Sequence, residues 1–330
     1  MSDNKTLTLA RAINEGLRRS LETDPKVLLM GEDIGALGGV FRVTDGLQKD
    51  FGEDRVVDTP LAESGILGTA IGLALRGYRP VCEIQFDGFI FPAYDQITTQ
   101  LAKMGYRSGG TLQVPVVIRV PYGGGIGAVE HHSESPEALF AHTAGLRVVS
   151  PSTPQDAFTM IQEAIASPDP VLFFEPKGRY WEKGPVETTG RGEGATVLDR
   201  ARVVRAGTDL TLVAYGPTVA TALRVAAAAE QEGRSIEVVD LRSISPLDTA
   251  TVVESVRRTG RCVVVHEAPT YLGSGAEVAA RVTEECFYSL EAPVLRVGGF
   301  HTPYPVAKIE HDYLPSLDRV LDAVDRAFAF

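Results

Sequence analysis

Glu63 is the first residue whose type and setting suggest chemistry. It stands in the stretch DTPLAESG, at the start of a predicted helix over 62–76 that is rich in Gly and Ala. With Thr59 as N-cap and Pro60 at the first helical position, Glu63 falls one residue past the capping-box position. Close packing of the small residues would desolvate the carboxylate and raise its pKa, so that it could share a proton with a ligand. A carboxylate that only stabilises the positive end of the helix is the other interpretation.

Two adjacent histidines, His131 and His132, stand in AVEHHSESPEALF, in a predicted loop just before a helix. Adjacent side chains point in different directions, so the pair is a poor chelator of one metal ion. None of the six histidines has a histidine partner four residues away. Imidazole titrates near neutral pH, which suits one of the two to acid–base catalysis. A surface or core histidine is the alternative.

A glycine-rich stretch, PYGGGIGA, follows a predicted strand, and Gly123, Gly125 and Ala128 fit the pattern G-x-G-x-x-A. A dinucleotide site also needs a helix at the pyrophosphate and an acidic residue about 20 positions further on. Here VEHHSESPE follows, and no Asp or Glu lies between Glu137 and Asp156. Glycines that let a loop pack closely are therefore favoured over nicotinamide binding. The chain also contains no P-loop, H-E-x-x-H or G-x-S-x-G motif.

The elements that must position these residues are predicted by β-branched runs that alternate with helix-length segments. This alternation is typical of an α/β protein with parallel sheets. The strands are predicted to begin at Val27, Val81, Val116, Leu146, Val171, Leu210, Ile236, Cys262 and Val294. The helices are predicted over 6–22, 62–76, 90–105, 155–166, 218–232, 248–258, 274–288 and 316–328. We expect a first domain over 1–180, a polar, Gly-rich linker over 181–195 and a second domain over 196–330.

Composition narrows the class of protein further. The 330 residues are 44% hydrophobic, and no apolar run approaches the roughly 18 residues of a membrane span. The formal net charge of -11 would repel nucleic acid, so we expect neither a nucleic-acid nor a membrane partner. Three scattered cysteines indicate neither a disulfide framework nor a thiolate metal site. The first residues have no apolar signal core, so we expect a cytoplasmic protein.

Several stretches stand in the same order as in one known family: DTPLAESG, EIQFDGFIFPAYDQI, KMGYRSGG, PYGGGIGAVEHHSESPE, HEAP, EECF and LEAPVLRVGG. Over nearly its whole length the chain resembles the beta subunit of the thiamine-diphosphate-dependent decarboxylating component of 2-oxo acid dehydrogenase complexes. The resemblance implies an α/β fold of two parallel-sheet domains. These are a pyrimidine-binding, transketolase-like domain and a transketolase C-terminal-like domain. It also implies oxidative decarboxylation of a 2-oxo acid with acyl transfer to a lipoyl group.

The resemblance also implies the site residues. Those expected at thiamine diphosphate are Glu32, Leu61, Ala62, Glu63, Gln85 and Phe89. Glu63 would hydrogen-bond the aminopyrimidine ring and activate the cofactor, while Phe89 would stack on the pyrimidine face. Glu32 would approach the same ring, although a salt bridge at a strand end accounts for it equally well. The family histidine precedes Ser, so the resemblance assigns the second catalytic role to His132, which would help transfer the acyl group.

The resemblance implies a partner as well. Enzymes of the wider family hold Mg²⁺ and the diphosphate with a G-D-G segment and later Asn ligands. This chain has no G-D-G, and its only asparagines are Asn4 and Asn14. We therefore expect no metal ligand from this chain and Mg²⁺ bound mainly by an alpha subunit, in an α2β2 heterotetramer. A lipoyl-bearing acyltransferase core is the second expected partner.

Substrate choice is the least specified feature. The stretches QFDGFIFPAYDQI and LEAP favour a branched-chain 2-oxo acid, with pyruvate as the alternative, and one methylene changes binding by only about 1–3 kcal/mol. Two hypotheses of other classes remain. A non-catalytic subunit would dock the enzyme on the core through its second domain, and a nicotinamide oxidoreductase would bind a dinucleotide by itself.

Overall fold

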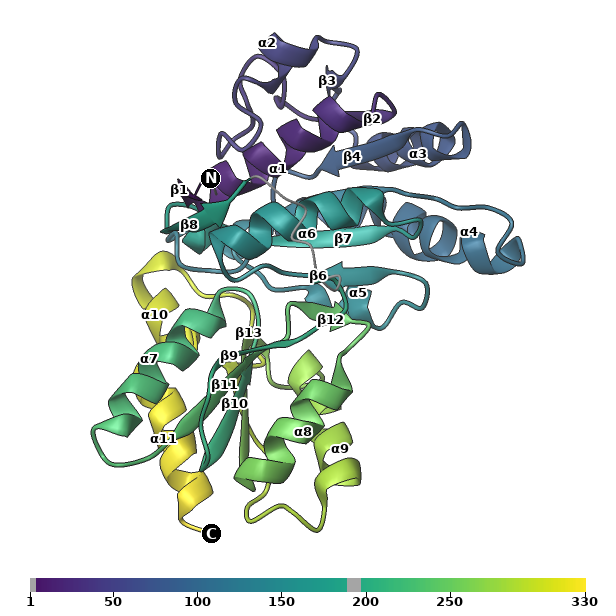
Figure 1. The fold of residues 1–330 in the computed structure, drawn as a ribbon. Helices are drawn as coiled ribbons and strands as arrows, with labels where there is room; N and C mark the ends of the chain where they lie inside the picture. Colours follow the sequence, from purple (N-terminus) through teal and green to yellow (C-terminus); the bar gives the residue numbers. More distant parts are fainter. Residues whose placement is uncertain (1–3, 189–196) are drawn as a thin grey trace.

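The computed structural model describes residues 4–188 and 197–330 and shows two parallel-rich sheets, one in each half of the chain (Figure 1). The strands of the first half are β1 (Asn4–Thr8), β2 (Val27–Gly31), β3 (Val56–Asp58), β4 (Arg79–Glu83), β5 (Val117–Tyr122), β6 (Arg147–Val149), β7 (Val171–Pro176) and β8 (Lys183–Glu187). Its helices are α1 (Leu9–Thr23), α2 (Leu47–Phe51), α3 (Glu63–Leu75), η1 (Asp87–Ala93), η2 (Gln96–Leu101), α4 (Ala102–Arg107), η3 (Glu130–His132), α5 (Glu137–Ala141), α6 (Pro154–Ala166) and η4 (Lys177–Arg179).

The second half repeats the alternation of strands and helices. Its strands are β9 (Arg202–Arg205), β10 (Leu210–Ala214), β11 (Ile236–Asp240), β12 (Ser243–Ser245), β13 (Cys262–Pro269) and β14 (Leu295–Gly299). Its helices are α7 (Thr218–Glu230), α8 (Thr249–Thr259), α9 (Ser274–Cys286), η5 (Ala307–Ile309), α10 (Glu310–Tyr313) and α11 (Leu317–Phe328).

Both large sheets are parallel except for one edge strand. The seven-stranded sheet has the order β12-β6-β7-β5-β4-β2-β3, and only β12 is antiparallel to its neighbour. The five-stranded sheet has the order β14-β13-β10-β11-β9, and only β9 is antiparallel. Strands β2, β5, β7, β10 and β11 are buried along their whole length, because helices cover both faces. The predicted α/β fold class is confirmed.

One hydrophobic core continues from the first half into the second. Tyr122 and Phe174, on β5 and β7, belong to the same buried cluster as Tyr215 and Val264 from the second half. On the other face of the first sheet, α1 packs against α6. Gly16 makes this crossing possible, because a Cβ there would lie 2.4 Å from a side-chain carbon of Ile161.

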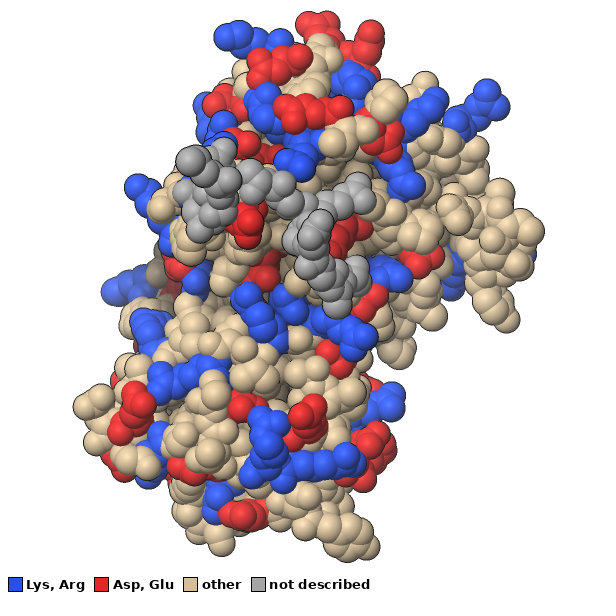
Figure 2. Space-filling model, in the orientation of Figure 1, with Lys and Arg blue, Asp and Glu red and all other residues tan. Residues whose placement is uncertain are grey.

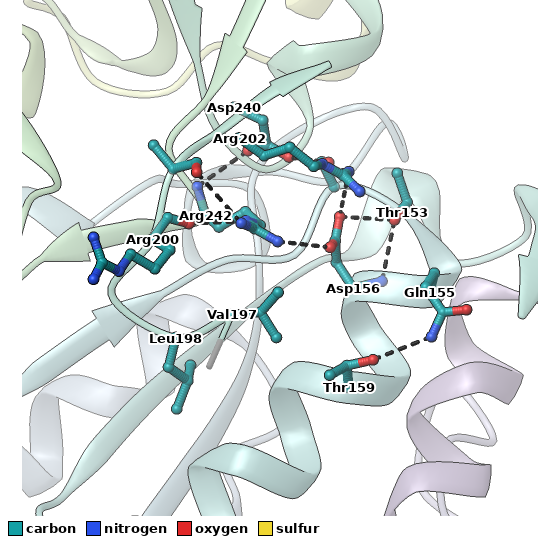
Figure 3. A network of polar contacts seen from close by, with 12 residues as sticks. Thr153, Gln155, Asp156, Thr159, Val197, Leu198, Arg200, Arg202, Asp240 and Arg242 are labelled. Atoms are coloured by element: carbon teal, nitrogen blue, oxygen red, sulfur yellow. Dashed lines mark hydrogen bonds and ion pairs between the residues drawn. The ribbon is translucent and has the colours of Figure 1, made fainter. Parts of the chain in front are cut away.

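A buried polar network also joins the halves (Figure 3). The carboxylate of Asp156, in the first turn of α6, accepts hydrogen bonds from Arg202 at 2.7 Å, Arg242 at 3.3 Å and Thr153 at 2.8 Å. Both arginines come from the second half. Next to them, burial raises the pKa of Asp240 to about 6 while Ser152 donates a hydrogen bond to its carboxylate. Charged groups therefore fix how the two sheets meet.

At three places the local structure differs in detail from the expectation. The chain over Asn4–Thr8 is strand β1 and not the start of a helix over 6–22, because its backbone pairs antiparallel with β8, from Asn4 opposite Glu187 to Thr8 opposite Lys183. Strand β8 itself lies in the segment expected as a linker over 181–195; residues 189–195 of that segment lie outside the described residues. The helix expected over 90–105 lies within a continuous helical run from 87 to 107, whose hydrogen-bond pattern changes from 3-10 in η1 to π in η2 and α in α4. Pro92, inside η1, cannot donate a backbone hydrogen bond.

Two further observations concern membrane-spanning helices and surface charge among the described residues. None of their helices is long and apolar enough to cross a membrane. On the face drawn in Figure 2, Lys and Arg side chains are interspersed with Asp and Glu. This face therefore presents charges of both signs and large uncharged areas.

Candidate active site

The residues expected at a site converge at one edge of the seven-stranded sheet. Strands β2, β3, β4 and β5 run parallel, so their carboxyl ends meet at the same edge. Glu32 directly follows β2, Glu63 follows β3 after a short turn, and Gln85 follows β4. The loop that leads to His132 begins where β5 ends. Parallel topology alone therefore places side chains from four separate segments together.

Glu63 is the first residue of α3 and is only 9% exposed. The expected N-cap at Thr59 is wrong: the cap residue is Ala62, which makes no side-chain capping bond. Residues 59–62 remain outside the helix, because the backbone N–H of Thr59 donates to the carbonyl of Gly31 at 2.9 Å and continues the strand pairing. Helix α3 therefore starts at Glu63, with the carboxylate at its positive end.

Glu32 lies beside Glu63 and is also buried. Burial raises the pKa of Glu32, and the negative charges of Glu63 and then Asp33 raise it further. The Oε1 atom of Glu32 is buried and has no hydrogen-bond partner. Two neighbouring carboxyl groups, one of them holding its proton more tightly than usual, form a site that can exchange a proton with a ligand.

Aromatic rings connect Phe89 with His132, while Gln85 bonds to the backbone of Glu32. The Nε2 atom of Gln85 donates to the backbone carbonyl of Glu32 at 3.4 Å. The imidazole of His132 lies 4.2 Å from the ring of Phe86 and 5.2 Å from the ring of Phe89, measured between centroids. Phe86 was not predicted as a site residue, although it stands three residues before Phe89. It is the N-cap of η1, and its ring meets the ring of Phe89 edge-on, with centroids 5.8 Å apart.

The two histidines have different surroundings. Only His132 packs on the aromatic rings, whereas the side chain of His131 is exposed. The backbone of His131 lies close to Gly88, where an added Cβ would be 2.7 Å from the His131 carbonyl oxygen. The close contact with Gly88 therefore holds the histidine segment against η1, and His132 is the histidine directed at the other site residues.

One wall of the site is open. Leu61 is 80% exposed, and Ala62 beside it is also exposed. The same side of α3 continues with Gly65 and Gly68, where an added Cβ would meet nothing beyond α3 and its cap residue within 4 Å. The site is therefore enclosed by this chain on the side of Glu32 and His132 and uncovered on the side of Leu61.

These residues fit the aminopyrimidine part of thiamine diphosphate. The orphaned Glu32 oxygen and the buried Glu63 carboxyl match a ring that exchanges protons, and Phe89 offers a flat apolar surface. Among residues 4–188 and 197–330, no group of three or more His, Cys, Asp or Glu side chains could hold a metal ion. Asn14 is used structurally, since its amide donates to the carbonyls of Val43 and Asp45.

The glycine-rich loop lacks the form of a dinucleotide site. Gly123, Gly125 and Gly127 all have positive φ, and the segment leads into the three-residue η3 and not into a long helix. A dinucleotide pyrophosphate needs a helix N-terminus at that point. The structure therefore supports the interpretation that these glycines allow close packing of the loop.

Comparison with known protein families identifies the class of each half of the chain. Residues 5–182 match the family "Transketolase, pyrimidine binding domain", and residues 199–320 match "Transketolase, C-terminal domain". A solved structure described as "Split gene transketolase, inactive beta4 tetramer" is 25% identical, covers 98% of both chains and has a TM-score of 0.80.

Similar curated proteins define the family more narrowly. A pyruvate dehydrogenase E1 component subunit beta from Leifsonia xyli is 64% identical over 99% of this chain and 96% of its own length. A 3-methyl-2-oxobutanoate dehydrogenase subunit beta from Mycobacterium tuberculosis is 55% identical over 98% of this chain and 92% of its own length. The chain belongs to the beta subunits of the E1 component of 2-oxo acid dehydrogenase complexes, a thiamine-diphosphate-dependent family whose members work with an alpha subunit.

Proposed function

We propose that this chain is the cofactor-activating half of a 2-oxo acid dehydrogenase E1 active site, which it completes with an alpha subunit in an α2β2 heterotetramer. The observation that supports this most is the convergence of Glu63, Glu32, Phe89 and His132 at one sheet edge, with the wall at Leu61 left open. A self-contained enzyme would cover that wall with its own residues.

Each site residue has a distinct task in this proposal. Thiamine diphosphate, when bound, supplies a nucleophilic carbon and an electron sink for decarboxylation. The Glu63 carboxyl holds a proton at the pyrimidine ring, and Glu32 next to it exchanges protons with the same region. Phe86 and Phe89 exclude water from this side of the site. The His132 imidazole, held against both rings, transfers a proton as the acyl group moves to a lipoyl arm.

The alpha subunit supplies Mg²⁺ and the diphosphate contacts in this proposal. An obligate interface buries a large apolar area, and the exposed Leu61, together with the small residues on α3, allows close approach of a second chain. The relative described as an inactive beta4 tetramer supports the same division of labour, because that assembly of beta chains alone is inactive. A lipoyl-bearing acyltransferase core receives the acyl group.

Two substrates are proposed, and each has its own support. Branched-chain 2-oxo acids are favoured by the stretches QFDGFIFPAYDQI and LEAP and by the 3-methyl-2-oxobutanoate dehydrogenase relative. Pyruvate is favoured by the relative that is 64% identical and is named a pyruvate dehydrogenase. Discrimination depends on the volume beside the reacting carbon, and the alpha subunit forms part of that wall in our proposal.

The test is to co-express the chain with its alpha subunit and to purify each chain alone and the complex. We expect decarboxylation that requires thiamine diphosphate and Mg²⁺ in the complex only, with a higher kcat/KM for 3-methyl-2-oxobutanoate than for pyruvate. The opposite preference would assign pyruvate as the substrate. Sustained turnover by the chain alone would contradict the shared site, and saturable NAD binding would favour the oxidoreductase hypothesis.

A further inference from the structure

The loop over 123–134, which leads from β5 to His132, is held by side chains from the second half of the chain. Glu310 is buried at the start of α10, and Glu267 lies near the end of β13. Both carboxylates reach across to backbone N–H groups of the loop, more than 140 residues away in the sequence. None of these contacts belongs to the sites assigned above.

Glu310 uses both of its oxygens. Its Oε1 atom accepts a hydrogen bond from the N–H of Gly125 at 3.1 Å and another from the hydroxyl of Tyr304 at 2.8 Å. Its Oε2 atom accepts from the N–H of Gly127 at 3.1 Å. The Oε2 atom of Glu267 accepts from the N–H of Gly124 at 2.9 Å. Two carboxylates thus bind three N–H groups within four residues of one loop.

The base of the loop is fixed from the first half. The N–H of Gly123 donates to the carbonyl of Glu134 at 3.0 Å, which closes the loop on itself. The N–H of Glu134 donates to the Asp87 carboxylate at 2.8 Å. Lys177 donates to the other oxygen of Asp87 at 3.0 Å and to the carbonyl of Gly123, and the side chains of both ionic residues are fully buried. His132 stands two residues before Glu134, next to this base.

Glycines allow the carboxylates to bind the loop in this way. Gly125 has a φ of +90° and Gly127 a φ of +70°, which other residues rarely adopt. A Cβ at Gly124 would lie 2.1 Å from the hydroxyl oxygen of Tyr304. The glycines therefore give the loop a conformation that the two carboxylates can bind. The path of the loop to His132 depends on this contact with the second half.

We propose that Glu310 and Glu267 are positioning residues, which hold the 123–134 loop so that the His132 imidazole stays against Phe86 and Phe89 during acyl transfer. The second half of the chain would then act in catalysis, in addition to any contact with the acyltransferase core. This inference rests on the proposed function of His132. Neither carboxylate touches the substrate; each acts through the loop.

The test compares two half-reactions in the complex with its alpha subunit. Glu310→Gln places an amide NH₂ where one oxygen accepted a hydrogen bond, so a donor faces one of the two glycine N–H groups. We expect kcat for acylation of a lipoyl domain to fall about 10-fold, with KM for the lipoyl domain unchanged. Decarboxylation with an artificial electron acceptor should fall by about 2-fold or less. Hydrogen exchange at the amides of Gly125 and Gly127 should become faster.

Three further variants separate the possible outcomes. Tyr304→Phe removes one donor to Glu310 and keeps the ring, so a smaller loss in the same half-reaction is expected even if Glu310→Gln folds poorly. Glu254→Gln, on an exposed face of the second half, is the matched control and should match the wild type. Adding Glu310→Gln to His132→Ala should cause no further loss of acyl transfer, because both changes affect one element.

Equal losses in both half-reactions, or unchanged exchange at Gly125 and Gly127, would overturn the positioning role. The proposed function is tested separately by Glu63→Gln and His132→Ala in the same assays. If Glu63→Gln keeps full decarboxylation, the proposed function is wrong. If both site variants lose activity as expected and Glu310→Gln behaves like the wild type, only the positioning role is wrong.

Discussion

The carboxyl edge of the seven-stranded sheet has two parts with opposite properties. Along β5 and β6, side chains from the second half cover it: Tyr215 donates to Glu137 at 2.6 Å, and Ser152 donates to Asp240. Along β2, β3 and β4, the described residues leave it uncovered at Leu61, and a buried oxygen of Glu32 has no partner. We refer to these as the closed part and the open part of the edge.

The difference indicates how one sheet serves two purposes. Contacts in the closed part join two domains into a fixed arrangement through hydrogen bonds from one half to the other, although the Oε2 atom of Glu137 is buried there without a partner. Residues of the open part are placed by the same strands, and in our proposal their bonding capacity is left for a ligand and a second subunit. Substitutions in the open part should therefore affect activity more than folding. Substitutions in the closed part should affect folding more than the chemistry, except at Glu267 and Glu310, which hold the 123–134 loop.

The largest expected effect is on activity in the open part. Glu63→Gln in the complex should lower decarboxylation at least about 100-fold, because a carboxamide cannot exchange a proton. The thermal midpoint should change little, since Gln has nearly the same shape. Initial rates and a melting curve measure both, and Glu53→Gln, at an exposed position, is the control. A variant that loses stability in proportion to activity would show that Glu63 is structural.

The next effect is on stability where the closed part meets α6. Asp156→Ala should lower the free energy of unfolding by about 3 kcal/mol, because Arg242 would stay buried without its carboxylate. Denaturation with urea measures this change. Asp50→Ala breaks an ion pair with Arg18 that is partly exposed, so it should cost less than about 1 kcal/mol. Equal losses in the two variants would contradict the special role of the network in Figure 3.

The stability of the fold should depend on pH through Glu137, which also lies in the closed part. Burial raises the pKa of Glu137 from 4.5 to about 7. Between these values the folded chain binds a proton that the unfolded chain lacks, so this group stabilises the fold less as pH rises from 4.5 to 7. Glu137→Gln removes the titration and should raise stability at pH 8 by at most about 3 kcal/mol, with little change at pH 4.5.

Melting curves at several pH values test this expectation. The slope should be reduced and not abolished, since Asp240, with its pKa raised to about 6, contributes in the same direction. A variant whose stability follows pH as the wild type does would show that Glu137 titrates at its ordinary value in the folded chain.

The smallest effect is expected at Thr59 in the open part. Its hydroxyl oxygen is buried without a hydrogen-bond partner, so Thr59→Val should keep or raise stability, by about 0.5 kcal/mol. A loss of more than about 1 kcal/mol in the same urea assay would mean that the hydroxyl is bonded in solution. That result would weaken the contrast between the two parts of the edge.

Much of the fold was predictable because it depends on local pattern. The apolar runs that form β2, β7, β10 and β11 are buried on both faces, and such runs are easy to recognise in the sequence. Strand β1 was missed because its partner β8 lies about 180 residues away, and no local pattern reports that pairing. Pro60 predicted that the helix starts at residue 60. The helix begins instead at Glu63, because the backbone of Thr59 still pairs with β2.

The site was predictable to a different degree. Motifs identified Glu63, Phe89 and His132 by resemblance, and the structure places His132 beside Phe89. Their chemical roles stay predictions. Glu267 and Glu310 could not be found in this way, because their contacts with the loop join two domains and depend on how the two sheets meet.

Strand β12 limits how this protein can be divided. It belongs to the second half in sequence but completes the first sheet, with Ser243 aligned with Val149 on β6. In a fragment that ends before residue 243, β6 would be an exposed edge strand, and exposed edge strands promote self-association. Dissection by truncation is therefore unsuitable for this chain, and point substitutions in the intact polypeptide are the appropriate tool for separating its activities.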